Sequence, residues 1–159
     1  MRNKTLGLVL AICFLATGAC FAEVLDVQMG TWKLDAAKSK LSRYMGRNDT
    51  VDYEWSFFKK KVTISGVAAN GQAIHSEWRG DFDGKDYAVT GDPTSDMRSY
   101  TKVNDHTLNF AVKKGGQIVA SGTIVVALDG KSRTVTSSAM RGKKKISSIA
   151  VYDKAKLFH

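Results

Sequence analysis

Cysteine is nearly absent from this sequence of 159 residues: there are two, Cys13 and Cys20, both close to the N-terminus. Residues 23–159 contain none, so no disulfide can hold that part of the chain together. A segment of that length corresponds to about one domain and can bury one sizeable core. We therefore expect its stability to come from the core, which Trp, Tyr and Phe side chains are available to fill.

Recognisable catalytic motifs are also absent. The sequence has no Gly-x-Ser-x-Gly, no phosphate-binding loop and no spaced set of His and Asp suited to a metal. Its histidines are His75, His106 and His159. His75 falls on the polar face of a predicted strand beside Glu77, which favours an exposed cross-strand contact over a catalytic base. We therefore assign no catalytic residue, no metal site and no cofactor.

The one long apolar run lies within residues 1–22. A short basic start precedes it and the small-residue stretch TGACFA follows it, which is the pattern of a secretory signal peptide. The run is too short for a membrane span, which needs roughly 20 apolar residues. Cleavage after Ala22 would release residues 23–159 as an exported protein, either periplasmic or secreted. Lipid attachment at Cys20 is the alternative fate of this leader.

Acidic residues are too few to balance the basic ones. The formal charge is +9 for the whole chain, and removal of Arg2 and Lys4 with the leader lowers it to +7. A basic domain often binds nucleic acid, but export argues against that partner. The charges also lie in predicted turns and are not interleaved with aromatic residues along one strand face. An anionic membrane surface is a better partner for the cluster RGKKK over residues 141–145.

Residues that favour tight turns recur at short intervals. Asn-Gly, Asp-Gly and Gly-Gly pairs supply the positive φ angles that two-residue hairpins need. Consecutive hairpins of this kind predict an antiparallel meander. The predicted turns are Lys59-Lys60, Asn70-Gly71, Asp83-Gly84, Gly91-Asp92-Pro93, Asn104-Asp105, Gly115-Gly116, Asp129-Gly130 and Arg141-Gly142.

Between these turns apolar and polar residues alternate. Val51, Tyr53 and Trp55 share one face of the second predicted strand, and the same alternation recurs in later strands. This pattern is typical of half-buried strands, and we predict about ten of them. Residues 35–45 are the exception, because Asp35 precedes AAKSKLSRYM as a helix N-cap would. One short helix is therefore expected after the first strand.

An antiparallel sheet of this size exposes two edges unless it closes, so we predict an all-β, up-and-down barrel. Gly30-Thr31-Trp32 in the first strand, the helix-like piece, the meander and the last strand ISSIAVYDK resemble the lipocalin and fatty-acid-binding-protein group. The resemblance in pattern covers nearly all of residues 28–154. It implies that Trp32 and Gly30 form the base of the barrel, with Lys154 packed across the indole.

Two features of fatty-acid-binding proteins are missing. The segment over residues 35–49 is too short for their pair of helices. Where their last strand carries the Arg-x-Tyr pair that holds a ligand carboxylate, this sequence has Ala150-Val151-Tyr152. We therefore interpret residues 23–159 as a single lipocalin-like barrel domain that is distant from the family.

Alternate turns of a meander lie at the same end of a barrel. The end that holds the connection between the first two strands is strongly basic, and by resemblance it is the entrance. A ring of positive charge at an entrance attracts anions. The basic side chains predicted at this end are Lys38, Lys40, Arg43, Arg47, Lys113, Lys114, Arg141, Lys143, Lys144 and Lys145.

A small apolar or amphipathic anion is the ligand that this arrangement favours. We predict that its apolar part contacts five aromatic residues inside the barrel and that its acid group lies near three basic ones. The aromatic residues are Tyr53, Trp55, Trp78, Tyr87 and Phe110. The basic residues are Arg43, Lys113 and Arg141.

Two other functions stay open. A small barrel can be filled by its own side chains, and the protein would then act without a ligand, contacting anionic membrane or envelope components through its basic end. The third hypothesis is an enzyme with a titratable pair of residues in a barrel cavity. A monomer is expected in each case.

Overall fold

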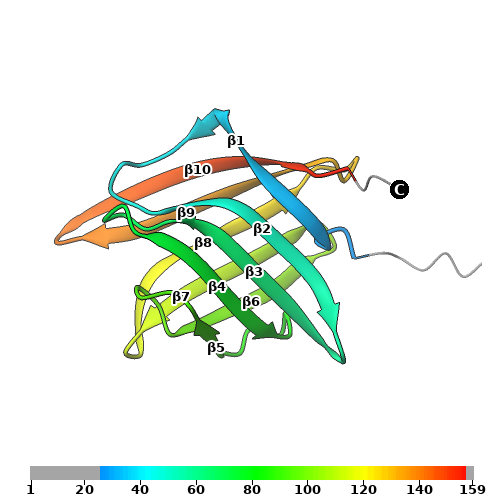
Figure 1. Cartoon of the computed structure of the whole chain (residues 1–159), viewed down its shortest axis with the longest axis horizontal. Helices are drawn as coiled ribbons and strands as arrows, with labels where there is room; N and C mark the ends of the chain where they lie inside the picture. The colour runs from blue at the N-terminus through cyan, green and yellow to red at the C-terminus, as the bar shows by residue number, and fades with distance from the viewer. Residues whose placement is uncertain (1–25, 157–159) are drawn as a thin grey trace, which may run out of the picture.

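The computed structural model describes residues 26–156, which form ten β-strands (Figure 1). The expected signal peptide, Cys20 included, lies outside the described residues. Among the described residues, no helix is long and apolar enough to cross a membrane. The strands are β1 (Gly30–Lys40), β2 (Arg47–Ser56), β3 (Lys59–Val67), β4 (Ala73–Gly80), β5 (Tyr87–Thr90), β6 (Met97–Asn104), β7 (Thr107–Lys114), β8 (Gln117–Val126), β9 (Ser132–Arg141) and β10 (Lys144–Lys154).

The strands close into one barrel. Each pairs antiparallel with the next along the chain, and β1 also pairs with β10. Trp32 in β1 stands opposite Val51 of β2 and Lys154 of β10. Closure satisfies the hydrogen-bonding groups that the edge strands of an open sheet would leave unpaired. The predicted meander and its closure are therefore confirmed.

Alternate turns lie at opposite ends of this barrel. We call the end with the β1–β2, β3–β4, β5–β6, β7–β8 and β9–β10 turns the open end. The other end, where the described chain begins and finishes, is the closed end. In Figure 1 the open end is on the left and the closed end is on the right. The basic turns named above therefore lie mostly at the open end.

One hairpin turn differs from the prediction. Ser56 pairs with Lys59, so the β2–β3 turn is Phe57-Phe58 and not Lys59-Lys60. Most other turns carry a glycine with positive φ, as predicted. Phe57 has a φ of 56° and is the one non-glycine residue with positive φ in the described part of the chain. This backbone conformation brings Cβ close to the following carbonyl oxygen and costs roughly 1–2 kcal/mol.

The short helix expected over residues 35–45 is wrong, because β1 continues as a strand to Lys40. The Asp35 carboxylate does accept hydrogen bonds from the N–H groups two and three residues later, at 3.0 and 3.1 Å. These bonds hold a bulge against β10, where Ser39 Oγ accepts the N–H of Val151 at 2.9 Å. The neighbouring strand thus supplies partners that override a local capping signal.

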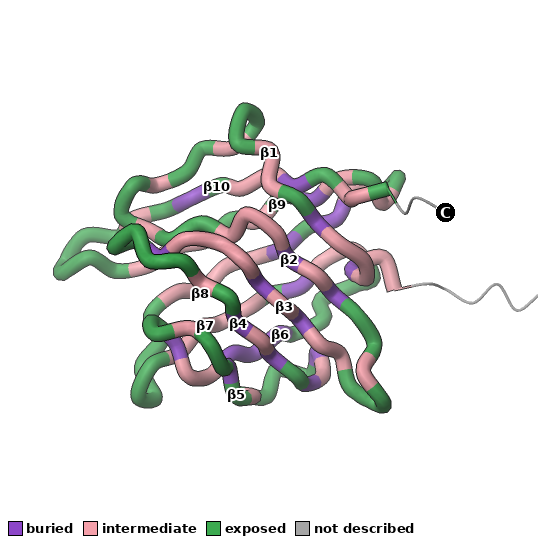
Figure 2. Tube along the Cα trace, in the orientation of Figure 1, coloured by how far each residue is buried: buried purple, intermediate pink, exposed green. Residues whose placement is uncertain are grey.

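The core lies toward the closed end, where many of the buried residues are found (Figure 2). Tyr53, Trp78, Phe82 and Tyr100 pack together with ring centroids between 4.9 and 6.3 Å apart. Such aromatic pairs stabilise a core beyond the area that they bury. Trp55, two residues after Tyr53, is 58% exposed. At Trp55, strand β2 extends beyond its pairing with β1, which ends at Tyr53. The side chain of Trp55 therefore does not point into the barrel, although the alternation predicts that it should.

Replacing Phe57 with Gly should raise the free energy of unfolding by about 1 kcal/mol, because glycine adopts positive φ without the steric cost. The matched control is Phe58→Gly, which relieves no left-handed strain and should lower stability by increasing the freedom of the unfolded chain. Urea unfolding of the two variants measures the difference. Equal destabilisation by both substitutions would contradict the strain assigned to Phe57.

Candidate functional site

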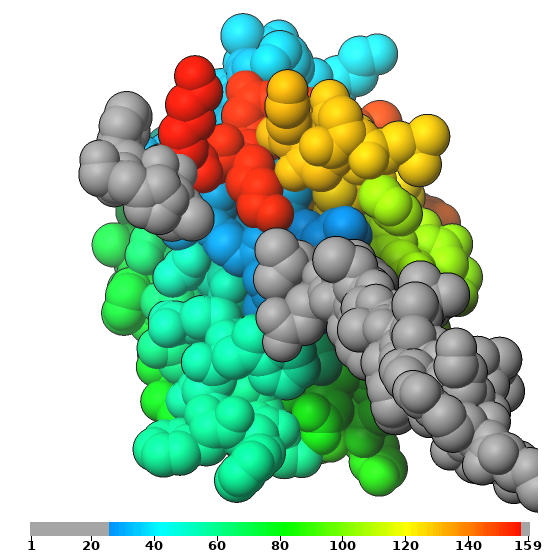
Figure 3. Space-filling model, turned by 90° about the vertical axis from the view of Figure 1, so that its right-hand side faces the viewer, coloured from blue at the N-terminus to red at the C-terminus, as the bar shows by residue number. Residues whose placement is uncertain are grey.

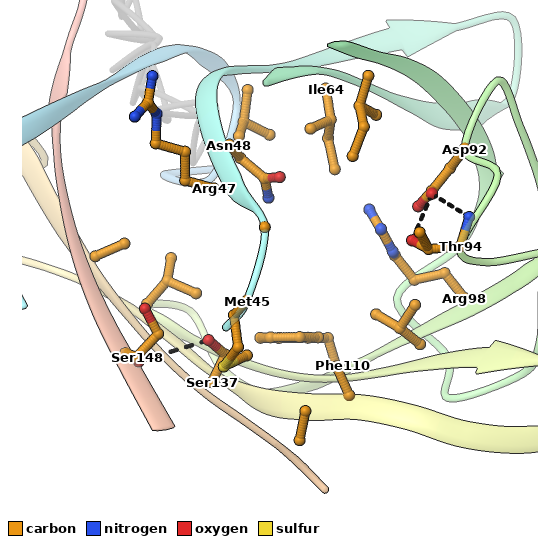
Figure 4. A pocket seen from close by; sticks show the side chains of 18 of the residues that line it. Met45, Arg47, Asn48, Ile64, Asp92, Thr94, Arg98, Phe110, Ser137 and Ser148 are labelled. Atoms are coloured by element: carbon orange, nitrogen blue, oxygen red, sulfur yellow. Dashed lines mark hydrogen bonds between the residues drawn. The ribbon is translucent and has the colours of Figure 1, made fainter. Parts of the chain in front are cut away.

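A cavity of about 440 Å³ occupies the barrel between the aromatic core and the open end (Figure 4). Leu41 and Met45 of the β1–β2 turn and Asp92 of the β5–β6 turn belong to its rim. The alternative of a barrel filled by its own side chains is therefore wrong. The apolar side chains that line the cavity include Val51, Ile64, Ile74, Phe110, Val112, Val119, Ile124 and Val135.

Trp32 closes the barrel at the other side of the core. Its side chain is fully buried, and its Nε1–H donates a hydrogen bond of 2.9 Å to the carbonyl oxygen of Gln28. Lys154 Nζ lies 5.0 Å from the centre of the indole ring. A Cβ at Gly30 would stand 3.0 Å from Lys154 Cε, so a glycine lets this lysine lie close to the strand. Gly30, Trp32 and Lys154 thus lie together at the closed end.

Arg133 of β9 lies at the bottom of the cavity and is only 2% exposed. Its guanidinium carbon lies 4.8 Å from the ring centre of Trp32, 4.9 Å from that of Tyr53 and 5.0 Å from that of Tyr152. Its Nε and Nη1 atoms have no hydrogen-bond partner among the described residues. The rings stabilise the cation, but they do not accept the hydrogen bonds that a carboxylate would.

The charge of Arg133 is not balanced nearby. It forms no ion pair with any carboxylate in the described part of the chain. Another cation at the closed end responds to this charge: burial lowers the pKa of Lys154, and the positive charge of Arg133 lowers it further. The floor of the cavity therefore carries positive charge that no ion pair among residues 26–156 neutralises.

A second buried arginine, Arg98 of β6, points into the cavity from its wall (Figure 4). It is 8% exposed, its Nη1 lies 3.5 Å from the hydroxyl of Tyr100, and its Nε has no partner within residues 26–156. Asp92 is the acidic residue of the cavity lining, but its carboxylate accepts hydrogen bonds from Thr94 and Ser95 at 2.6 to 2.8 Å.

The state of Asp92 follows from those bonds. Burial acts to raise its pKa, but the hydrogen bonds from Ser95 and Thr94 hold the pKa below its usual value, and the charge of Arg98 adds to this effect. The carboxylate is therefore ionised at neutral pH. The cavity lining also includes Arg47, which forms an ion pair of 2.7 Å with Asp49. With two buried arginines and one carboxylate, the interior stays positive overall.

Tyrosine hydroxyls add polar groups beside Arg133. Burial raises the pKa of Tyr53 far above its ordinary value and raises that of Tyr152 to about 12, although the charge of Arg133 opposes both shifts. Both side chains are therefore neutral at physiological pH. The hydroxyl of Tyr152 donates a hydrogen bond of 2.9 Å to the carbonyl oxygen of Asn48. This bond connects the last strand to β2 above the arginine.

Arginine, tyrosine and serine side chains are among the polar groups of the cavity lining. The cavity lining has no histidine, cysteine or glutamate among the described residues. His75 hydrogen-bonds with Ser65 at 3.0 Å, but this pair lies exposed on the outer face of the barrel. In the part of the chain that the structure describes, no group of three or more metal-ligating side chains is arranged to hold a metal ion.

Of the five aromatic residues predicted to contact a ligand, Tyr53 and Phe110 line the cavity. Trp78 is buried in the core below it and donates its Nε1–H to the carbonyl oxygen of Arg98 at 2.9 Å. Tyr87 packs edge-on against Trp78 with ring centres 5.7 Å apart. Trp55, on the outside at the closed end, is not part of the lining. The structure therefore places two of the five at the cavity.

The three basic residues predicted to hold the acid group lie outside the cavity lining. Lys113 forms an ion pair of 2.6 Å with Asp86. The guanidinium groups of Arg43 and Arg141 lie 4.6 and 4.0 Å from the ring centre of Tyr44, which does belong to the rim. They add positive potential at the open end but do not reach the interior.

Sequence reasoning missed Arg98 and Arg133 because it searched for basic residues in turns. The signal was present in the strand pattern. Arg98 alternates with Tyr100, and Arg133 alternates with Val135, so each arginine has the parity of an inward-facing apolar residue. An arginine at an inward position of a predicted strand is an unusual burial that indicates a special role.

Comparisons with known proteins identify no family. No family model matches the chain, and no curated protein matches it. A solved structure that is similar to it is a redesigned β-barrel, mFAP1, bound to DFHBI. The two chains have a TM-score of 0.41 and 14% sequence identity, over 81% of this chain and 95% of that one.

The raised pKa of Tyr152 predicts a loss of stability in alkaline solution. Burial lifts the pKa from 10.0 to about 12, so this side chain stabilises the fold fully below about pH 10 and less as the pH rises through 12. In that range its contribution to the free energy of unfolding should fall by about 1.4 kcal/mol per pH unit.

Urea unfolding at a series of pH values tests this dependence. Tyr152→Phe should remove that part of the slope, whereas the control Tyr44→Phe, at a residue that is 39% exposed, should keep it. An unchanged slope in Tyr152→Phe would show that the hydroxyl is not buried as described.

Proposed function

We propose that this protein binds a small amphipathic anion in the cavity, with the anionic group on Arg133 and the apolar part against the walls. The observation that carries the proposal is the burial of two arginines, Arg133 and Arg98, neither of which forms an ion pair among residues 26–156. Asp92 interacts with Arg98 by charge, whereas Arg133 faces only aromatic rings. Removing a charge from water is costly unless it is paired and hydrogen-bonded. A bound carboxylate, sulfonate or phosphate would supply the missing acceptors.

The size and lining of the cavity support the same class of ligand. Its volume of about 440 Å³ is within the range of small-molecule pockets, which is roughly 300–1,000 Å³. The walls are mainly aliphatic, with Phe110 and the rim residue Tyr44 offering aromatic surface. Because Arg133 lies at the bottom, the anionic group would enter first and the apolar part would fill the space toward the open end.

The charge of the open end supports capture of an anion. Positive side chains around a low-dielectric entrance raise the local concentration of anions and their rate of encounter. Arg43 and Arg141 flank Tyr44 at the rim and serve this role in the proposal. The acid group itself binds deeper, at the two buried arginines, and not at the rim as the sequence alone had indicated.

We further propose that the protein is an exported, lipocalin-like carrier. The leader pattern of residues 1–22 supports export. The indole of Trp32 at the closed end, with a basic side chain packed across it, supports the lipocalin-like interpretation. In this barrel two cations contact that ring, Lys154 from the last strand and Arg133 from the strand before it.

Arg133→Met should weaken the binding of an amphipathic anion about 10- to 100-fold, because a hydrogen bond to a charged group contributes about 1.5–3 kcal/mol. Anilinonaphthalene sulfonate is a suitable probe, since its fluorescence rises in an apolar site. Arg98→Met should weaken binding as well. Arg133→Met should leave the free protein at least as stable, because it removes a buried charge that has no ion-pair partner among the described residues.

The matched control is Arg141→Met, which removes a rim guanidinium that does not line the cavity. Its effect on affinity should be small and should disappear at high salt. Wild-type affinity in Arg133→Met and Arg98→Met, together with loss of binding in Arg141→Met, would place the anion at the rim and refute the buried site.

A further inference from the structure

The most exposed large apolar side chains of the barrel are adjacent in sequence. Phe57 and Phe58, which form the β2–β3 turn, are 93% and 94% exposed. We call this pair the Phe tip. The β2–β3 turn lies at the closed end, which faces the viewer in Figure 3, and the cavity lies on the other side of the core. Two neighbouring aromatic rings in water are unfavourable unless another surface covers them.

The backbone of the Phe tip indicates that the two rings serve a purpose other than folding. A two-residue hairpin with positive φ at its first position favours glycine there. The chain does place glycine at positive φ in other turns, such as Gly71, Gly130 and Gly142. Here it places Phe57 at a φ of 56° instead. The turn therefore combines an unfavourable backbone conformation with an exposed aromatic side chain.

From the Phe tip toward the barrel, the exposed side chains change from purely apolar to amphipathic and then to charged, as they do across a membrane surface. The amphipathic side chain is Trp55, which is 58% exposed. Lys60 Nζ lies 4.4 Å from the centre of that ring and forms no ion pair in the described part of the chain. Its neighbours in sequence are ion-paired, Lys59 with Asp81 at 2.5 Å and Lys61 with Glu54 at 2.8 Å, so Lys60 is the lysine of this segment available to an anionic surface. Tryptophan and lysine at this depth suit the headgroup region, while the phenylalanines suit the acyl boundary.

A second apolar projection occurs at the same end. Leu128 in the β8–β9 turn is 92% exposed, and Lys131 follows it in the same turn. Around the rim of the closed end, the start of β1 and the finish of β10 lie between this turn and the β2–β3 turn. The chain therefore enters the barrel between the two projections.

We propose that the closed end docks on a lipid bilayer that contains anionic lipid, with the Phe tip inserted at the acyl boundary and Leu128 as a second contact. Lys60 and Lys131 complement the negative headgroups. In this orientation the open end and its basic rim face the aqueous phase, so the cavity stays accessible. The proposal is independent of what the cavity binds.

Flotation of residues 23–159 with vesicles of phosphatidylethanolamine and phosphatidylglycerol in equal parts tests the docking. This segment contains all ten strands and therefore the complete barrel. The variant is F57G/F58N, because Gly-Asn suits the turn and should keep the fold stable. We expect the wild type to float with the vesicles and F57G/F58N to lose roughly tenfold or more of the affinity.

Intrinsic fluorescence gives a second readout. Of the three tryptophans, Trp32 and Trp78 are buried and Trp55 is exposed, so a blue shift on vesicle addition reports on Trp55. The shift should be present in the wild type and absent in F57G/F58N. The control K143S/K144S removes charge from the open end and should behave as the wild type does.

Three results would overturn the proposal. They are a wild type that does not float, a variant F57G/F58N that floats as the wild type does, and loss of flotation in K143S/K144S alone. Sedimentation of the free protein as a dimer that F57G/F58N dissociates, without vesicle binding, would assign the Phe tip to self-association instead.

Discussion

The buried guanidinium of Arg133 determines how the interior of the barrel is organised. Three aromatic rings, those of Trp32, Tyr53 and Tyr152, surround the cation at about 5 Å and compensate part of its lost hydration. They leave its Nε and Nη1 without acceptors among the described residues. A protein interior rarely tolerates such a group, and function at a ligand site is the usual reason for it.

This constraint divides the barrel into two parts. Toward the closed end, Trp32 and the cluster of Trp78, Phe82 and Tyr100 form a packed core that supplies stability. Toward the open end, mainly aliphatic side chains line the cavity above Arg133. The core therefore supports the arginine from below while the cavity presents it from above. The two proposals concern opposite ends, ligand capture at the open end and membrane docking at the closed end.

Much of the fold could be predicted from local signals. Turn pairs such as Asn70-Gly71 indicate where strands end, and closure follows because an unpaired edge is unfavourable. The site was less predictable. Whether a side chain near a strand end faces the interior or the solvent depends on the tilt of the strand, which no local sequence pattern encodes. Trp55 has the same parity as Tyr53 and yet lies beyond the barrel. Arg133 was missed for the opposite reason, since a charged residue is ordinarily assumed to face water.

Native mass spectrometry of the processed protein, purified gently from its own host, can show whether an anion occupies the site at Arg133. We expect a co-purified small acid, bound in a one-to-one complex and absent from the Arg133→Met protein prepared in parallel. Bare polypeptide in repeated wild-type preparations, with no complex formed on adding amphipathic carboxylates or sulfonates, would contradict it. The unpaired guanidinium would then need a different explanation.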